Sequence, residues 1–450
     1  MHIFKISIFL SLFSVLAFAK SGTIKIQGEV SNPTAKSISI DDLNNGKVID
    51  MDLNDAGVFK GSARIDSGYF MLKYGRNTFY IYLHPKDNLQ ITFDAEHMAE
   101  TIALDGKGSI RNNYLIAKRA LNKSEFQDIE RFYQTNEDDY LDNVNNLRDK
   151  QLELLSDYKV ASYFKRDEMQ SIEYGRLMNI KRFESNLDFY LGEKVTASED
   201  LLKPIYKIDY DNEPHYSKFL DFKYLSNSYY SDLIENGENV DGMLAQLQKV
   251  PHQSLLINLV NGFYYKISSK NERAEDYLKL IKRVVNDQPF VEAAQNRYDN
   301  IKDAAKLSKG QQSPNFSYES ISGEMISLAD FKGKWVYIDV WATWCAPCVQ
   351  QIPYLKKLEE RYHDEAIVFV SISVDKKRAK KAWKQMISDK DLDGIQLFAD
   401  NSFDSAFMEA YAVNSIPRFI ILDPDGNVYN PEAPRPSFPK TQETLDGLLR

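Results

Sequence analysis

The chain has 450 residues, of which 43% are hydrophobic and 12% aromatic, and a formal net charge of −9 at pH 7. This length exceeds what one ordinary core fills, so we expect two or three domains, and the apolar share excludes a disordered chain. The acidic balance argues against a nucleic-acid-binding protein, which would carry a basic surface.

The N-terminus has the pattern of a secretory signal peptide. Residues 1–5 are short and basic, residues 6–18 are apolar apart from serines, and Ala17-Phe18-Ala19 forms a small–x–small cleavage site. A membrane anchor is the alternative, but the apolar run is shorter than the roughly 20 residues that span a bilayer. No cysteine that could carry a lipid follows the run. We predict that residues 1–19 are cleaved and that the protein is periplasmic or otherwise extracytoplasmic.

Residues 20–110 are predicted to form a small all-β, sandwich-like domain. Apolar and polar side chains alternate there with the period of a half-buried strand. Turn signals such as Asp66-Ser67-Gly68 recur at the spacing typical of a small sandwich or barrel. The alternation is clearest in three runs, residues 23–27, 37–40 and 48–53.

Residues 111–306 are predicted to be mostly helical. Glycine becomes sparse after Gly108, and apolar residues fall on one helical face with charges between them, as at Val144, Leu147 and Leu155. We expect breaks near three prolines, Pro204, Pro214 and Pro251. The many tyrosines and phenylalanines of this region are compatible with a helix-packing core and with a surface that docks another protein.

Residues 307–450 are predicted to be a linker followed by an α/β domain with a mixed central sheet and flanking helices. Strand-type and helix-type patterns alternate along this segment. The predicted strands are residues 335–341, 366–374, 395–399, 418–422 and 427–429. The predicted helices are residues 345–362, 379–388 and 403–411, with a closing helix after the last strand.

The chemistry of this domain is expected at Cys345-Ala346-Pro347-Cys348. These are the only two cysteines of the chain, and so close a pair cannot link distant segments. In a compartment where disulfides persist, we interpret them as redox reagents. A helix that begins at Cys345 places partial positive charge beside its sulfur and favours the thiolate. Cys345 is then the attacking thiol, and Cys348, one turn later and expected to be less exposed, resolves the mixed disulfide.

Three other uses of the motif fit the sequence less well. Zinc needs about four ligands, and no second cysteine or histidine pair stands at ligand spacing. A purely structural disulfide would close too short a loop to stabilise much. Peroxidase chemistry favours the pattern Pro-x-x-x-Thr-x-x-Cys, whereas Ile338 and Ala342 occupy those positions here. We predict no metal and no cofactor beyond the redox-active disulfide.

The segment from about residue 313 to 450 resembles the TlpA/ResA-like branch of the thioredoxins, a group related to the AhpC/TSA proteins. The motifs that carry the resemblance are residues 331–334 (FKGK), 340–348 (VWATWCAPC), Pro353, 372–375 (ISVD) and 413–417 (VNSIP). The preceding β-structure resembles a domain of unknown function often found ahead of thioredoxin domains in secreted bacterial proteins. The resemblance implies a thioredoxin fold and thiol–disulfide exchange.

The resemblance also implies site residues. Pro417 matches the family's cis-proline facing the disulfide, and Ile416 would offer its backbone to an extended substrate segment. Trp344, Trp341 and Pro347 would shape the substrate surface around Cys345. Asp339, a carboxylate within an apolar strand, should be buried with a raised pKa, and it matches the acid that helps deprotonate the resolving cysteine. A carboxylate satisfied by a neighbouring backbone group or lysine is the alternative.

Two positions depart from the pattern. Gln351 stands three residues after the second cysteine, where some members carry glutamate, and Arg418 follows the cis-proline, where threonine is usual. Both leave the substrate undefined.

We expect protein or peptide thiols and disulfides as substrates, a membrane electron donor, and no nucleic acid. A ligand- or partner-binding protein of the cell envelope with an accessory thioredoxin module is the competing hypothesis. The long N-terminal region could also form a homodimer that sets two active sites in one cleft.

Overall fold

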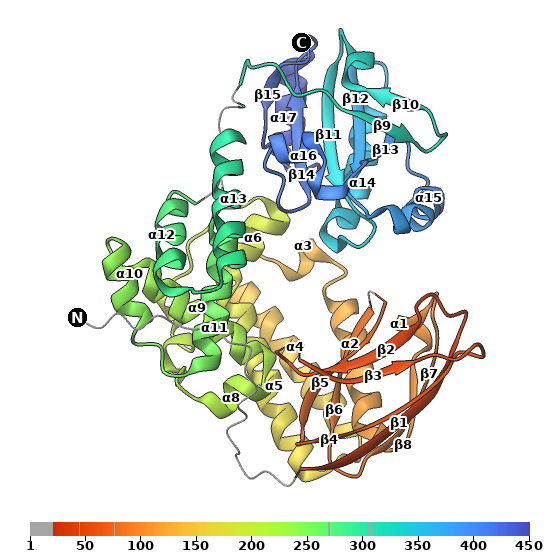
Figure 1. Cartoon of the computed structure of the whole chain (residues 1–450), viewed down its shortest axis with the longest axis vertical. Coiled ribbons are helices and arrows are strands. Elements are labelled where there is room, and N and C mark those ends of the chain that lie inside the picture. The colour runs from red at the N-terminus through yellow and green to blue at the C-terminus, as the bar shows by residue number, and fades with distance from the viewer. Residues whose placement is uncertain (1–20, 45, 76, 269–270, 305–306, 308) are drawn as a thin grey trace. The chain divides into compact units, whose positions relative to one another are not determined.

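The computed structural model describes residues 21–450 except 45, 76, 269–270, 305–306 and 308 (Figure 1). The predicted signal peptide lies outside the described residues. The chain forms two compact units that divide between Leu259 and Val260. Within the described part of the chain, no helix is long and apolar enough to cross a membrane.

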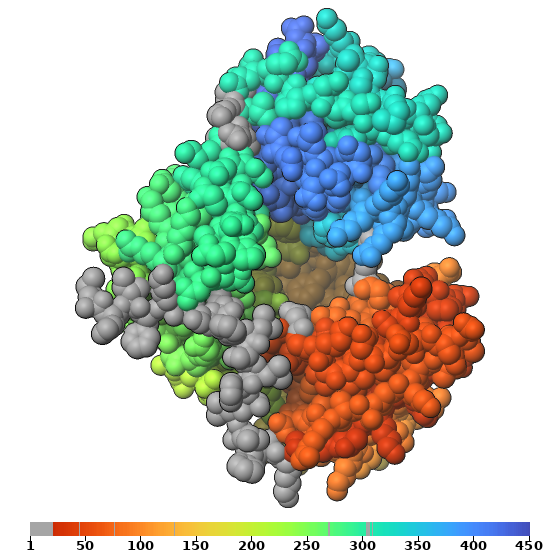
Figure 2. All heavy atoms as spheres, viewed as in Figure 1, coloured from red at the N-terminus to blue at the C-terminus, as the bar shows by residue number. Residues whose placement is uncertain are grey.

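The β-structure of the first unit comprises two four-stranded sheets. One has the strand order β4-β1-β7-β8 and the other the order β3-β2-β5-β6. The elements are β1 (Gly22–Ser31), β2 (Ser37–Asp41), β3 (Lys47–Asp52), β4 (Val58–Ile65), β5 (Gly68–Tyr74), β6 (Asn77–Leu83), β7 (Asn88–Asp94), α1 (Met98–Thr101) and β8 (Ala103–Lys107). In the space-filling view their side chains form a continuous surface, coloured red to orange (Figure 2). The predicted β-structure is confirmed.

The pairing of β1 with β7 depends on a glycine. The two strands run parallel, with Gly28 opposite Ile91. A Cβ atom at Gly28 would collide with the carbonyl oxygen of Ile91. The alternation of β1 sets which face is buried. Ile24, Ile26 and Val30 point into one apolar core, while the charged and polar side chains between them face solvent.

The helices that follow are α2 (Ser109–Glu125), α3 (Ile129–Phe132), α4 (Glu137–Asp157), α5 (Ser162–Lys181), α6 (Phe183–Leu191), α7 (Glu199–Leu202), η1 (Ile205–Lys207), α8 (Glu213–Lys218), α9 (Leu220–Glu235), α10 (Val240–Leu247) and α11 (Gln253–Lys266). The predicted breaks are confirmed, since Pro204 precedes η1, Pro214 lies in the first turn of α8 and Pro251 precedes α11. A proline fits the first turn of a helix but not its interior.

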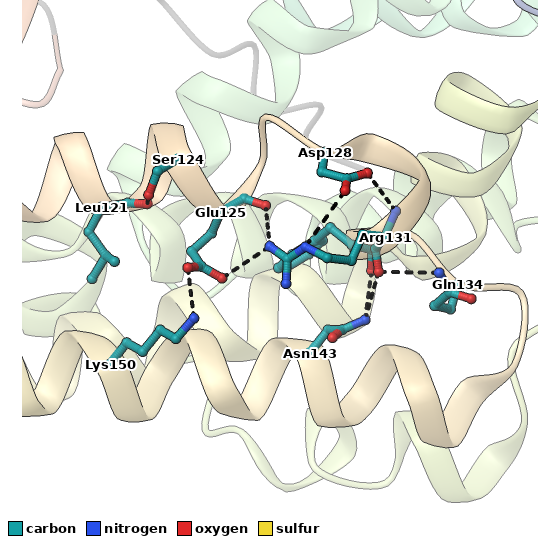
Figure 3. A network of polar contacts seen from close by, with 9 residues as sticks. Leu121, Ser124, Glu125, Asp128, Arg131, Gln134, Asn143 and Lys150 are labelled. Atoms are coloured by element: carbon teal, nitrogen blue, oxygen red, sulfur yellow. Dashed lines mark hydrogen bonds and ion pairs between the residues drawn. The ribbon is translucent and has the colours of Figure 1, made fainter.

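A polar network around Arg131 fixes the connection from α2 to α4 (Figure 3). The backbone N–H of Arg131 donates to Asp128 at 3.0 Å, and its guanidinium lies 3.4 Å from the Glu125 carboxylate. Lys150 of α4 donates to the same carboxylate at 2.7 Å, and the Asn143 amide donates to the Arg131 carbonyl at 3.1 Å. Since these groups come from three helices, the network ties α2, α3 and α4 together.

A buried carboxylate joins the β-structure of this unit to its helices. Glu168 of α5 is fully buried and accepts hydrogen bonds from Tyr69 of β5 at 2.6 Å and from Tyr114 of α2 at 3.1 Å. Lys118 of α2 completes the group as its ion-pair partner. A buried charge is tolerated only with such partners.

The second unit contains the predicted α/β domain, and its mixed sheet has the order β10-β9-β13-β12-β11-β14-β15. Its elements, after the end of α11, are α12 (Ala274–Val284), α13 (Gln288–Ala304), β9 (Ser317–Ser320), β10 (Met325–Ser327), η2 (Leu328–Phe331), β11 (Trp335–Trp341), α14 (Ala346–Arg361), β12 (Ile367–Ser373), η3 (Lys377–Ala379), α15 (Lys380–Asp389), β13 (Ile395–Phe398), η4 (Ser402–Asp404), α16 (Ala406–Ala410), β14 (Arg418–Leu422), β15 (Val428–Asn430) and α17 (Pro439–Leu448).

Both faces of this sheet are covered by helices. Helices α14 and α17 contribute Leu355, Leu358 and Leu445 to one apolar cluster, and α15 and α16 contribute Trp383 and Phe407 to the other. The central strand β11 pairs parallel with β12 and antiparallel with β14, so α14 is the crossover of a βαβ unit and runs back along β11. The thioredoxin-type fold class is confirmed.

The prediction missed two features of this domain. The short hairpin β9–β10 pairs with the sheet through β13, although strands of four and three residues carry too little alternation to be recognised. The helix predicted over residues 403–411 is interrupted, because Ser405 adopts an extended backbone between η4 and α16.

Replacing Glu168 with alanine should destabilise the first unit. The Glu168→Ala variant leaves the partly buried Lys118 without its counter-charge and the hydroxyls of Tyr69 and Tyr114 without their acceptor, which costs about 3 kcal/mol of the free energy of unfolding. Urea unfolding followed by far-UV circular dichroism measures this loss. Glu153→Ala, at an exposed position of α4, is the matched control and should change stability by less than about 0.5 kcal/mol. Equal stability of the two variants would contradict the assigned role.

Candidate active site

The two cysteines lie at the start of α14, shortly after the end of β11. They form a disulfide, with their Cα atoms 5.2 Å apart. Cys345 is the N-cap of α14, and its Sγ atom accepts the backbone N–H of Cys348 at 3.2 Å. The helix start therefore directs an N–H group and its positive dipole end at the sulfur of Cys345. Pro347 lies in the first turn, where its missing N–H costs no helical hydrogen bond.

Cys348 was predicted to be less exposed than Cys345, but the two residues are about equally buried. Cys345 is 4% exposed and Cys348 3%. Both belong to the apolar cluster beneath the active-site end of the sheet. The distinction between attacking and resolving thiol consequently depends on position in the helix, not on solvent access in this oxidised form.

Asp375 holds the loop that carries Cys345. The carboxylate is fully buried at the end of β12 and accepts the backbone N–H and the hydroxyl of Thr343, each at 2.8 Å. The Ser373 hydroxyl donates to it at 3.0 Å. This role of Asp375 was not predicted, although an aspartate soon after a buried strand is a recognisable signal for such a loop anchor.

The predicted cis-proline is confirmed, because the Ile416–Pro417 peptide bond is cis. Arg418, the next residue, pairs with Val340 near the end of β11. This register places Pro417 and Ile416 beside the loop from Trp341 to Cys345. Ile416 packs against the cluster that contains both cysteines.

The two predicted surface tryptophans have different positions. Trp344 is 47% exposed, and its ring lies 6.3 Å from that of Phe403. Trp341 is 2% exposed, with its indole N–H buried, so it cannot form part of the substrate surface as predicted. The reason is its position at the end of β11, where the strand is covered by helices on both faces. Trp341 supports the site from beneath.

Asp339 lies in the middle of β11 and is 8% exposed. Its Oδ1 atom is buried and has no hydrogen-bond partner among the described residues. Burial, and secondarily the charge of Glu359, raises the pKa of Asp339 to about 8. The predicted burial and raised pKa are found, and no lysine or backbone group satisfies this oxygen in the described part of the chain.

Glu359 of α14 is a second perturbed carboxyl that the sequence analysis did not identify. Burial, together with the charge of Asp393, raises its pKa to about 7. An interior position of a helix with charged neighbours gives no sequence signal for such burial. Asp339 and Glu359 are therefore two carboxyls whose pKa values are raised toward neutral pH.

The described residues contain no group of three or more histidine, cysteine, aspartate or glutamate side chains that could hold a metal ion. The chemistry accessible to the residues brought together here is thiol–disulfide exchange with a nearby buried acid.

The raised pKa of Asp339 predicts a pH-dependent cost of folding. The folded chain keeps the Asp339 proton up to about pH 8, whereas the unfolded chain releases it near the ordinary value of 3.8. Stability relative to an Asp339→Asn variant should therefore fall as pH rises, by about 1.4 kcal/mol per pH unit between about pH 5 and pH 8. Urea unfolding at several pH values checks this slope. Asp364→Asn, an exposed control, should follow the wild type, and a constant difference between Asp339→Asn and wild type would contradict the burial argument.

Comparison with known proteins agrees with this site. The Redoxin family model matches residues 308–447. The thioredoxin-like protein YneN of Bacillus subtilis (strain 168) is 37% identical over 129 residues, covering 27% of this chain and 68% of the relative. A thiol-disulfide oxidoreductase ResA of Bacillus cereus is 28% identical over 148 residues, covering 33% of this chain and 80% of the relative.

Among solved structures, a solution structure of a putative thiol-disulfide oxidoreductase from Bacteroides vulgatus is 51% identical to this chain. The match covers 32% of this chain and 92% of that structure's chain, with a TM-score of 0.29. All these similarities concern about a third of the chain or less, and the family match begins at residue 308. Through this C-terminal third, the chain belongs to the redoxin family, as a TlpA/ResA-like thiol–disulfide oxidoreductase.

Proposed function

We propose that this protein acts outside the cytoplasm as a reductase or isomerase of protein disulfides, using the Cys345–Cys348 dithiol. The observation that carries the proposal is the position of Cys345 at the N-cap of α14, with its sulfur accepting the Cys348 N–H at 3.2 Å. A sulfur in this position is stabilised as the thiolate, which is the form that attacks disulfides.

The reaction begins with the reduced dithiol. The Cys345 thiolate attacks one sulfur of a substrate disulfide, so that a Cys345–substrate S–S bond forms and the substrate S–S bond breaks. The displaced substrate sulfur leaves as a thiolate and takes a proton from solvent. Cys348 then attacks Cys345, the internal disulfide forms, and the second substrate sulfur leaves. Two electrons pass to the substrate, and a reductant outside this chain must restore the dithiol.

Asp339 is assigned the role of accepting the proton of the Cys348 thiol. The resolving thiol must lose its proton before it attacks. With a pKa of about 8, Asp339 is ionised in a minority of molecules at neutral pH, and this carboxylate is basic enough to accept the thiol proton. Its place in β11, covered by the helix that carries Cys348, supports this role. After the step the carboxyl is protonated and the cysteines are joined as the disulfide.

Substrate binding is assigned to the surface around Cys345. Trp344 offers an exposed aromatic face, and Pro347 lies between the two cysteines. The Ile416–Pro417 segment supplies backbone groups that an extended peptide could pair with, as in strand addition. Such a surface suits unfolded or locally extended protein segments that contain cysteine.

The location rests on the sequence alone. Residues 1–19 have a signal-peptide pattern, and a pair of redox cysteines is useful where disulfides form. A membrane protein that delivers electrons from the cytoplasm is the class of partner that such a reductase needs.

Insulin reduction by purified protein tests the activity. Wild type should accelerate the reduction at least about tenfold over Cys345→Ser, because the variant lacks the nucleophile. Refolding of a scrambled-disulfide substrate distinguishes isomerase from reductase activity. A wild-type rate no higher than that of Cys345→Ser would contradict the proposed enzyme function.

The reduction potential of the Cys345–Cys348 pair tests the direction of electron flow. We expect a value nearer to about −270 mV, typical of a reductase, than to about −120 mV, typical of an oxidase. Equilibration with glutathione or dithiothreitol buffers, followed by thiol labelling, measures it. A potential near the oxidising value would reverse the proposed direction while leaving the chemistry intact.

A further inference from the structure

The proline-rich segment between β15 and α17 is pinned to the active-site domain at several points. This strap, Pro431–Phe438, has no regular secondary structure, and its prolines limit its backbone freedom. Arg418 donates to the Pro431 carbonyl at 3.0 Å and pairs with Glu432. The backbone N–H of Ala433 donates to the carbonyl of Phe419 at 2.9 Å.

Two further contacts extend the strap across the face that α14 covers. The Tyr337 hydroxyl donates to the Pro434 carbonyl at 2.8 Å. The Ser437 N–H donates to the side-chain oxygen of Gln351 at 3.1 Å, and Gln351 is 7% exposed on α14. The Ser437 hydroxyl oxygen is buried with no partner among the described residues.

These contacts lie on the same face of the sheet as Asp339. Tyr337 and Asp339 are two residues apart on β11 and share a face of the sheet, and Phe419 stands opposite Asp339 on β14. Since α14 runs back along β11, the start of the helix lies at the level of the end of the strand. Gln351 is one turn after Cys348 and one turn before Leu355, which packs on this face. The strap, anchored at Gln351, therefore closes the side of the sheet on which the Asp339 carboxyl lies.

We propose that Gln351 is a positioning residue, which anchors the strap to α14 so that water is kept from Asp339 and the pH at which this carboxyl takes the Cys348 proton is set. The inference rests on the proposed proton transfer. Glutamine suits this role because its uncharged side-chain oxygen accepts the Ser437 N–H without adding a carboxylate to those of Asp339 and Glu359.

Few other titratable groups near Asp339 could change the pH at which it takes the proton. Of the charged groups of α14, Glu359 is the one whose charge acts on Asp339, and Cys348 is the proton donor of the proposed step. On β11 the titratable neighbour is Tyr337, whose pKa is itself raised by burial and by Asp339. The opposing residues of β12 and β14 are Ser371 and Phe419, which do not titrate in this range. On the strap, Glu432 is paired with Arg418, and Arg435 lies 5.9 Å from the ring of Phe438.

The test follows the second step of the reaction in the full chain. Reduced protein is mixed with dithiobis(nitrobenzoate), whose first thionitrobenzoate is released by Cys345 and whose second is released when Cys348 resolves the mixed disulfide. The rate of the second release is measured against pH. Asp339→Asn should abolish the inflection assigned to the carboxyl.

Gln351→Ala should move this inflection about one pH unit lower, because an opened strap admits water to Asp339. Gln351→Leu keeps the buried volume without an acceptor and should behave in the same way, which guards against a misfolded alanine variant. Gln351→Glu keeps the acceptor for Ser437 and should leave the inflection at or above the wild-type pH. Gln350→Ala, exposed on the same helix, is the matched control.

The results distinguish failure of the proposed proton transfer from failure of the role of Gln351. If wild type does not release a second equivalent, or Asp339→Asn keeps the wild-type profile, the proposed proton transfer fails. If those two behave as expected while Gln351→Ala and Gln351→Leu retain the wild-type inflection, only the role of Gln351 and the strap is overturned.

Discussion

The chemistry of this protein depends on one hydrogen bond at the start of a helix. The backbone N–H of Cys348 points at the sulfur of Cys345 because Cys345 is the N-cap of α14. The positive end of the helix then lies at the sulfur to which we assign the attack. The surrounding structure maintains this arrangement, since β11 delivers the loop, Asp375 fixes Thr343 and the cis-proline segment lies beside it.

A second constraint is the presence of buried acids under that helix. Burying a carboxyl costs stability unless it is paired or protonated, and Asp339 has an oxygen without any partner in the described part of the chain. The first unit shows the contrasting solution, since Glu168 is buried with two tyrosines and a lysine. The unpartnered oxygen and raised pKa of Asp339 are the observations that support the proposed proton transfer.

The sequence predicted those features that depend on local pattern. The apolar run of β11, the helix start at Cys345 and the burial of Asp339 all follow from residues close together in the chain. The contacts that complete the site do not, because Gln351 and Ser437, or Thr343 and Asp375, are far apart in sequence and meet only through the fold. The prediction for Trp341 was wrong because a resemblance places this residue near Cys345 in the chain without showing that its side chain points into the core.

The most direct test of the central assignment is to identify which cysteine carries the trapped substrate. A Cys348→Ala variant should accumulate mixed disulfides with protein substrates, and mass spectrometry should locate the bond at Cys345. The reciprocal Cys345→Ala variant should show only background labelling. Equal trapping by both variants, or bonds formed mainly at Cys348, would contradict the assignment of attack to the sulfur at the start of the helix.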